Sequence, residues 1–229
     1  MRILAVDTSC DAASVCLYDG ATQASLAARG EAMSRGHAQA LAPMVSDVLA
    51  EAGFAATSID RIAVTVGPGS FTGIRVGLAL CRAMGLALDV PVVGISTLVA
   101  LAGPLFLASR SGVIVSAIDA RHGWLYFQVF EPQGRPLTQP RIDLAEAAAR
   151  AAERGPVRVT GAGARLFVAA AQSTGLQIDE SACAAFPDAV ALARLGAAAD
   201  PLLCPPRPLY IKAPDAEVST IGAIARTEG

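Results

Sequence analysis

Two segments far apart in the chain share a pattern that limits the fold more than any other feature. Residues 3–7 read Ile-Leu-Ala-Val-Asp and residues 115–119 read Val-Ser-Ala-Ile-Asp. Each predicts a buried strand that ends in aspartate, and each is followed by a short polar turn, an alternating strand and a glycine-containing turn. A repeated unit of this kind predicts two related halves within one chain. A chance resemblance between two generic hairpins is the alternative.

The other predicted elements fill both halves with strands and helices. In the first half we expect strands at 14–18, 22–29, 62–66 and 90–95, and helices at 35–52, 72–88 and 96–101. In the second half we expect strands at 113–119, 124–130 and 157–160, and helices at 144–153, after Gly163 and at 188–199. The sequence therefore predicts an α/β protein with two domains, 1–104 and 105–212, each a mixed sheet flanked by helices. Residues 213–229 are expected to form a tail, for which no function is predicted.

Composition restricts the class of function. The 229 residues carry a formal net charge of −2, and Lys212 is the one lysine. A protein that binds nucleic acid by itself usually presents a basic stripe, so we expect any contact with RNA to depend on a partner. Five cysteines without a Cys-x-x-Cys pair indicate reduced thiols and a cytoplasmic protein. The apolar stretch 98–108 is about half of the ~20 residues that a membrane span needs, so no membrane contact is expected.

A glycine-rich loop joins a predicted strand to a predicted helix. Residues 67–73 read Gly-Pro-Gly-Ser-Phe-Thr-Gly. We expect a tight turn in which Ser70 or Thr72 caps the following helix. The alternative is an anion site made by backbone amides at the amino terminus of that helix. The loop is not a P-loop, because no Gly-Lys-Ser/Thr follows.

The helix after this loop carries small residues at every fourth position. Gly73, Gly77, Cys81 and Gly85 therefore share one narrow face. Glycine inside a helix costs about 1 kcal/mol relative to alanine, so a close approach of other atoms should offset that cost. Packing within the domain and contact with another subunit are both compatible with this face.

Six segments of the sequence together resemble the TsaB family. They are residues 3–9, 35–38, 66–77, 91–98, 118–121 and 208–212, and the Gly-Pro-Gly-Ser-Phe-Thr-Gly-Ile-Arg-Val-Gly run is the most specific part. The resemblance implies the actin, Hsp70 and sugar-kinase fold, or ASKHA fold, in which two opening hairpins face each other across a cleft. It also implies a part in forming threonylcarbamoyl-adenosine beside the tRNA anticodon.

The partners follow from the same resemblance. In that family a related TsaD-type subunit carries out the transfer, and a TsaE-type ATPase joins the complex. This chain would then be a non-catalytic scaffold that contacts tRNA only through the complex. In isolation it could form a homodimer through the same surface, although one surface cannot serve both assemblies at once.

With the family resemblance in view, the small-residue face is assigned to the subunit interface. The expected interface residues lie on the two N-terminal helices and are Met44, Val48, Gly73, Arg75, Gly77, Cys81 and Gly85. The change Gly77→Trp is then expected to abolish pairing and to leave a folded monomer.

The implied cleft supplies a second set of candidates. The residues expected to contact a nucleotide there are Asp7, Thr8, Ser9, Asp119, Gly161 and Gly163. In active relatives such carboxylates position a metal–phosphate group or an attacking water. Aspartate at the end of a strand is also a common turn residue. We expect no resident cofactor, with ATP or ADP in this cleft or at a subunit interface as the alternative.

The sequence lacks the metal ligands of the transferase. That relative carries a His-x-x-x-His pair whose positions align with Thr97 and Leu101 of this chain. Leucine cannot ligate a metal, and neither His37 nor His122 has a ligand partner at helical spacing. We therefore expect no metal site and no catalytic residue.

Two other functions stay open at this point. A stand-alone ATPase or kinase of the ASKHA fold would bind nucleotide through Asp7 and Asp119. A peptidase would need Ser9 or Ser70 in contact with His37, and no Gly-x-Ser-x-Gly elbow is present.

Overall fold

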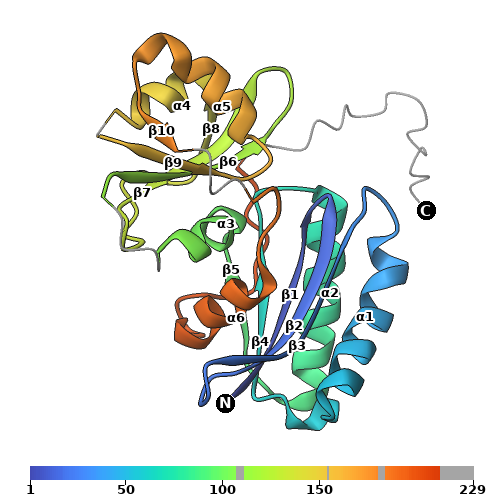
Figure 1. The fold of residues 1–229 in the computed structure, drawn as a ribbon. Helices are drawn as coiled ribbons and strands as arrows, with labels where there is room; N and C mark the ends of the chain where they lie inside the picture. The colour runs from blue at the N-terminus through green and yellow to red at the C-terminus, as the bar shows by residue number, and fades with distance from the viewer. Residues whose placement is uncertain (107–110, 154, 180–183, 212–229) are drawn as a thin grey trace, which may run out of the picture.

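A computed structural model describes residues 1–106, 111–153, 155–179 and 184–211. It contains two five-stranded mixed sheets, one in each half of the chain, with helices packed against them (Figure 1). The predicted α/β fold with two helix-flanked sheets is confirmed. The predicted tail, 213–229, lies outside the described residues.

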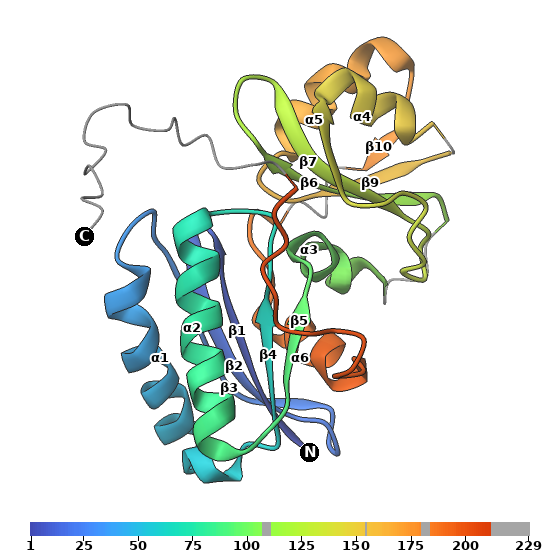
Figure 2. The same cartoon turned by 180° about the vertical axis from the view of Figure 1, so that it is seen from behind.

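The first sheet has the strand order β3-β2-β1-β4-β5. Its strands are β1 (Arg2–Cys10), β2 (Ala12–Asp19), β3 (Ala24–Ala32), β4 (Arg61–Thr65) and β5 (Val92–Ile95). β1, β2 and β3 form an antiparallel meander, and β4 and β5 run parallel to β1. The helices α1 (His37–Ala52) and α2 (Phe71–Leu88) cover one face, while the short 3-10 turn η1 (Ala56–Ser58) precedes β4 (Figure 2).

The second sheet repeats the same topology, with the order β8-β7-β6-β9-β10. Its strands are β6 (Val113–Asp119), β7 (Trp124–Phe130), β8 (Arg141–Leu144), β9 (Val157–Thr160) and β10 (Ile178–Asp179). The helices α4 (Ala145–Ala151) and α5 (Ala164–Ala171) pack on it, and η2 (Gln172–Thr174) follows α5. β6 is antiparallel to β7 and parallel to β9, as β1 is to β2 and β4. The repeat predicted from the two strand–aspartate segments is therefore present in the fold.

The other face of the first sheet is covered by a helix from late in the sequence, and a second helix packs between that helix and the second sheet. α3 (Thr97–Phe106) follows β5, and α6 (Ala189–Ala198) returns from the second half of the sequence. Leu192 and Ala193 of α6 pack in one buried cluster with Ile3 and Ala63 of the first sheet. The residues of 105–212 thus do not all belong to the second sheet, because α6 completes the core of the first.

A side chain of the first sheet holds the end of α6. Arg61 Nη1 donates hydrogen bonds to the carbonyl oxygens of Gly196, Ala197 and Ala199, at 2.9, 3.1 and 2.8 Å. These carbonyls have no partner within the helix, so a cation at this end satisfies them. Gly196 also lets the helix touch the sheet, since a Cβ there would lie closer than 3.0 Å to the Cβ of Ala63.

Several elements differ from the prediction: β1 continues past Asp7 to Cys10, where a turn was expected, and β10 was not predicted. Two further differences have identifiable reasons. α3 runs through Gly103 and Pro104 to Phe106, because Gly103 faces Leu195 of α6 and the packing outweighs the helix-breaking pair. β8 was not predicted, because its four residues run directly into α4 without a turn residue between them.

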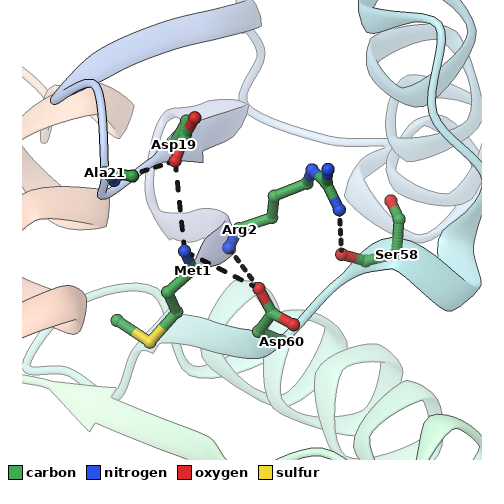
Figure 3. A network of polar contacts seen from close by, with 6 residues as sticks. All are labelled: Met1, Arg2, Asp19, Ala21, Ser58 and Asp60. Atoms are coloured by element: carbon green, nitrogen blue, oxygen red, sulfur yellow. Dashed lines mark hydrogen bonds and ion pairs between the residues drawn. The ribbon is translucent and has the colours of Figure 1, made fainter.

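Polar contacts fix the beginning of β1 to two neighbouring turns (Figure 3). The Met1 amino group lies 4.0 Å from Asp19 and 3.9 Å from Asp60. The Arg2 amide donates to Asp60 at 2.6 Å, and its guanidinium donates to the carbonyl of Ser58 at 3.4 Å. Ion pairs at an exposed position contribute little, so this network aligns the strand end more than it stabilises the fold.

Candidate functional site

The carboxyl end of β1 places Asp7 inside the protein. Its side chain is fully buried, and Oδ1 accepts hydrogen bonds from the Ser9 amide (3.0 Å), the Ser9 hydroxyl (2.5 Å) and the Thr65 hydroxyl (2.6 Å). Oδ2 has no hydrogen-bond partner in the part of the chain that the structure describes. Burial raises the pKa of Asp7, and the bonds from Ser9 and Thr65 oppose that rise. The carboxyl group therefore organises the strand end and does not face solvent.

Thr8 and Ser9 lie directly against the glycine-rich loop. The Ser70 amide donates to the Ser9 carbonyl at 2.7 Å, and the Thr8 hydroxyl donates to the Gly73 carbonyl at 2.7 Å. A Cβ on Gly69 would come closer than 3.0 Å to the Ser9 carbonyl oxygen. The Ser70 hydroxyl accepts a hydrogen bond from the Gly73 amide at 3.2 Å and so caps α2, as the capping prediction expected. The loop is a packed turn, and its neighbour is the protein's own strand.

The small-residue face of α2 packs against its own sheet. Cβ atoms on Gly73 and Gly77 would lie closer than 3.0 Å to the Thr8 carbonyl and hydroxyl oxygens. A Cβ on Gly85 would meet Val92 of β5 in the same way, and Cys81 is fully buried. A close approach of other atoms therefore offsets the cost of glycine in the helix, as expected. The approaching atoms belong to β1 and β5 of the same chain and not to another subunit.

This packing corrects most of the predicted interface. Six of the seven interface candidates are buried within the chain: Met44, Val48, Gly73, Gly77, Cys81 and Gly85. The four residues of α2 in this set contact their own sheet, and Met44 also borders a surface depression between α1 and β3. Arg75 is the one candidate of the seven that the structure leaves exposed.

The opposite face of α2 is exposed and largely apolar. Its exposed side chains are Phe71, Thr72, Arg75, Ala79, Arg82, Ala83, Leu86 and Ala87. Leu86 is 87% exposed, and the two arginines are the charged residues among these eight. By length and composition alone, α2 is the one helix within the described ranges that could span a membrane. Its glycine face is fixed on the sheet, so the helix instead presents an apolar stripe on the protein surface.

The sequence could not separate these two faces. A helix that is apolar on nearly all sides gives little contrast between its inner and outer surfaces. The available signal was the glycines themselves, because a face without side chains allows the closest approach to a sheet.

Of the six cleft candidates, only Gly161 lines the depression in this region. Gly161 and Gly163 lie against the backbone of β6, where a Cβ on either would come closer than 3.0 Å to Ala117 or Ile118. Asp119 is exposed, and its Oδ1 accepts a hydrogen bond from the Arg121 amide at 2.7 Å, as in a turn. A depression of about 560 Å³ lies beside this region, lined by Asp11, Gly161, Ala162, Ala164, Arg165, Ala185 and Phe186. Neither Asp7 nor Asp119 lines it.

The hydroxyl groups needed for a peptidase are engaged elsewhere. His37 is buried, and its Nε2 lies 3.2 Å from the carbonyl oxygen of Cys10. Ser9 is bonded to Asp7 directly, and Ser70 caps α2. No hydrogen bond joins a serine to His37 among the described residues, so the described part of the chain has no serine–histidine relay.

The positions that align with the transferase's histidine pair lie in the core. Thr97 and Leu101 occupy the first turns of α3, and both are buried. Leu101 packs with Leu98 and Ile118, beneath the second sheet. In the described ranges, no group of three His, Cys, Asp or Glu residues is placed to hold a metal ion.

The raised pKa of Asp7 gives a pH-dependent prediction. The folded state binds the carboxyl proton of Asp7 more tightly than the unfolded chain does. The free energy of unfolding should therefore fall as pH rises from about 4 through the folded-state pKa. Asp7→Asn keeps an oxygen to accept from Ser9 and Thr65 but cannot ionise, so its stability should lack this part of the slope. Asp7→Ala leaves those donors unpaired and should cost about 2–3 kcal/mol. Urea unfolding of the three proteins across the pH range measures both effects; equal slopes for wild type and Asp7→Asn would contradict the assignment.

The two sheets and the opening hairpins define a class of protein. Two sheets of equal topology, each opening with a hairpin whose first strand carries an aspartate at or near its end, form the ASKHA arrangement. A polyphosphate/ATP-glucomannokinase from Arthrobacter sp. strain KM shares it, with a TM-score of 0.51 and 16% identity over 86% of this chain and 98% of that one. At this identity the likeness shows the fold alone.

Similarity to known sequences then identifies the family. The family model described as "TsaD: tRNA N6-adenosine threonylcarbamoyltransferase" matches residues 29–195, so the chain belongs to this family. The "tRNA threonylcarbamoyladenosine biosynthesis protein TsaB" of Escherichia coli (strain K12) is 37% identical over 131 residues. That match covers 57% of this chain and 55% of the E. coli protein, so the chain spans about half the length of the curated relatives it matches.

A solved structure agrees over nearly the whole fold. The Pseudomonas aeruginosa protein described as having "similarity to peptidase YEAZ" has a TM-score of 0.76 and 28% identity, over 92% of this chain and 99% of that one. The resemblance to the TsaB family is confirmed by these matches.

Proposed function

We propose that the chain is a non-catalytic cytoplasmic subunit that supports a TsaD-type transferase in forming threonylcarbamoyl-adenosine in tRNA. The name of the E. coli relative supports the pathway. The accessory role is carried by the start of α3, where the two positions that the resemblance aligns with the transferase's histidines are buried Thr97 and Leu101. Neither residue can supply the imidazole pair that the resemblance assigns to the transferase.

The outer face of α2 supports docking on the transferase. It is an exposed apolar stripe on a rigid helix whose other side is fixed to the sheet. A helix face of this composition is stabilised by burial against another protein surface, at about 25 cal/mol per Å² of apolar area. We propose that the TsaD-type partner covers it in the complex and that a second copy covers it in isolation. We also propose that the TsaE-type ATPase joins the complex. Because the net charge of this chain is −2, tRNA is contacted through the partners.

A reconstituted transfer assay tests the proposal. tRNA, labelled threonylcarbamoyl donor, ATP, the TsaE-type ATPase and the TsaD-type transferase are combined with and without this chain, and this chain is also assayed without the transferase. Labelled tRNA is expected only when both this chain and the transferase are present. Product from this chain alone would overturn the non-catalytic role, and product independent of this chain would overturn the supporting role.

The rival function is a stand-alone ATPase or kinase. Asp7 is buried, Asp119 holds a turn, and neither lines the depression beside Gly161, which argues against it. We propose that the isolated chain has no resident cofactor. Calorimetry with ATP and magnesium ions should give no heat of binding; binding that depends on Asp7 and Asp119 would favour the rival.

A further inference from the structure

The amino-terminal end of α2 carries an exposed cluster built from two distant parts of the chain. The Arg75 guanidinium carbon lies 3.7 Å from the centre of the Phe71 ring. That ring lies 5.4 Å from the Tyr210 ring, and Arg75 Nε donates a hydrogen bond to the Tyr210 hydroxyl at 3.0 Å. Phe71 and Tyr210 are 40% and 41% exposed. These three residues form the arginine–aromatic cluster.

Tyr210 reaches α2 because the preceding segment, residues 204–209, is held along the first sheet. The Gly94 amide donates to the Cys204 carbonyl at 2.9 Å, and the Leu209 amide donates to the Val66 carbonyl at 2.7 Å. Gly67 and Gly94 have no room for a side chain, since a Cβ on either would come closer than 3.0 Å to this segment. In Figure 2 the segment rises from α6 beside β5 toward the upper end of α2. The backbone hydrogen bonds of residues 204–209 therefore fix the position of Tyr210 beside α2.

The cluster leaves part of the guanidinium unused. Arg75 has a hydrogen bond through Nε, and across the described ranges no carboxylate lies within ion-pair distance of it. Its two terminal nitrogens can still donate to an anion of matching geometry, and on a protein partner that anion is the carboxylate of Asp or Glu. Arginine and tyrosine are also the residue types most often found at the energetic centres of protein interfaces.

We propose that Tyr210 is a positioning residue that holds Arg75 ready to bind a carboxylate side chain of the TsaD-type partner as that partner covers α2. The inference rests on the proposed function and adds the chemistry of the contact. A guanidinium already stacked on Phe71 and bonded to Tyr210 loses less side-chain entropy on binding than a free arginine does. Within the described ranges, no carboxylate compensates the charge of Arg75, so a carboxylate of the partner could do so.

The test measures the affinity of the full chain for the purified transferase at two salt concentrations. Arg75→Gln is expected to weaken binding about 30-fold and to flatten its salt dependence, because the charge is lost. Tyr210→Phe keeps the ring and the charge, so it is expected to weaken binding about fivefold with an unchanged salt dependence. In the Arg75→Gln background, Tyr210→Phe should cause no further loss, because the two residues act as one unit.

Trp124 provides a matched control for Tyr210, because both are aromatic residues of equal exposure. Trp124→Ala removes an aromatic side chain of equal exposure, 41%, from the second sheet and should leave affinity unchanged. Additive effects of Arg75→Gln and Tyr210→Phe, or unchanged affinity in either, would overturn the positioning role. If Arg75→Gln keeps its affinity for the transferase but the assembled complex loses tRNA binding, Arg75 binds a phosphate of tRNA and not a carboxylate of the partner. That result would overturn the proposal. If Leu86→Asp abolishes binding and Arg75→Gln does not, the inference fails and the proposed function stands. If the unaltered chain does not bind the transferase, both are contradicted.

Discussion

Gly73→Ala is expected to destabilise the chain by about 3 kcal/mol or more, although alanine favours a helix by about 1 kcal/mol over glycine. The new Cβ would lie closer than 3.0 Å to the carbonyl oxygen of Thr8, which belongs to the backbone of central strand β1. A backbone atom cannot rotate away as a side chain can. Either α2 or β1 must shift, and the hydrogen bond from the Thr8 hydroxyl to the Gly73 carbonyl is lost with it.

Urea unfolding followed by circular dichroism measures this effect. Ala79→Leu is the matched control, because it enlarges a side chain on the exposed face of the same helix and should change stability by less than about 0.5 kcal/mol. If Gly73→Ala proved neutral, the contact between α2 and β1 would be looser than the structure has it. The earlier expectation for Gly77→Trp changes accordingly, since Gly77 also faces Thr8 and the variant should fail to fold rather than yield a monomer.

The strands of the second half show how much of the fold the sequence specifies. The predicted ranges 113–119, 124–130 and 157–160 coincide with β6, β7 and β9. These strands combine apolar or alternating residues with turn residues at both ends, so local pattern and tertiary context agree. The strand–aspartate repeat likewise predicted the duplicated topology, because each copy encodes one opening hairpin.

The partner of a helix is not encoded in the same way. α6 has an apolar face that would suit either sheet, and its sequence position next to the second half favoured the wrong one. Long-range contacts decide the matter: the carbonyls at its end meet Arg61, and Gly196 meets Ala63. For the candidate site, the pattern predicted the helix α2 but not that its small-residue face packs on β1 and β5, because small residues suit a partner helix and a neighbouring strand equally well.

Leu86→Asp should abolish binding to the TsaD-type transferase, with an affinity loss of at least about 100-fold and no loss of folding. Leu86 is 87% exposed, so a charge there costs little in the free chain. In the complex the same carboxylate would be buried in the apolar contact of α2 without a partner, which is the costly case. Affinity is measured by calorimetry or by sizing with light scattering, alongside thermal unfolding of each variant.

Leu202→Asp is the matched control, since Leu202 is 89% exposed and lies outside α2. It adds the same charge to the same residue type at nearly the same exposure, so any general effect of net charge appears in both variants. Loss of binding in Leu86→Asp alone localises the docking surface to the outer face of α2. Equal affinity in the two variants would move the interface elsewhere, and equal loss in both would show that charge rather than burial controls the association.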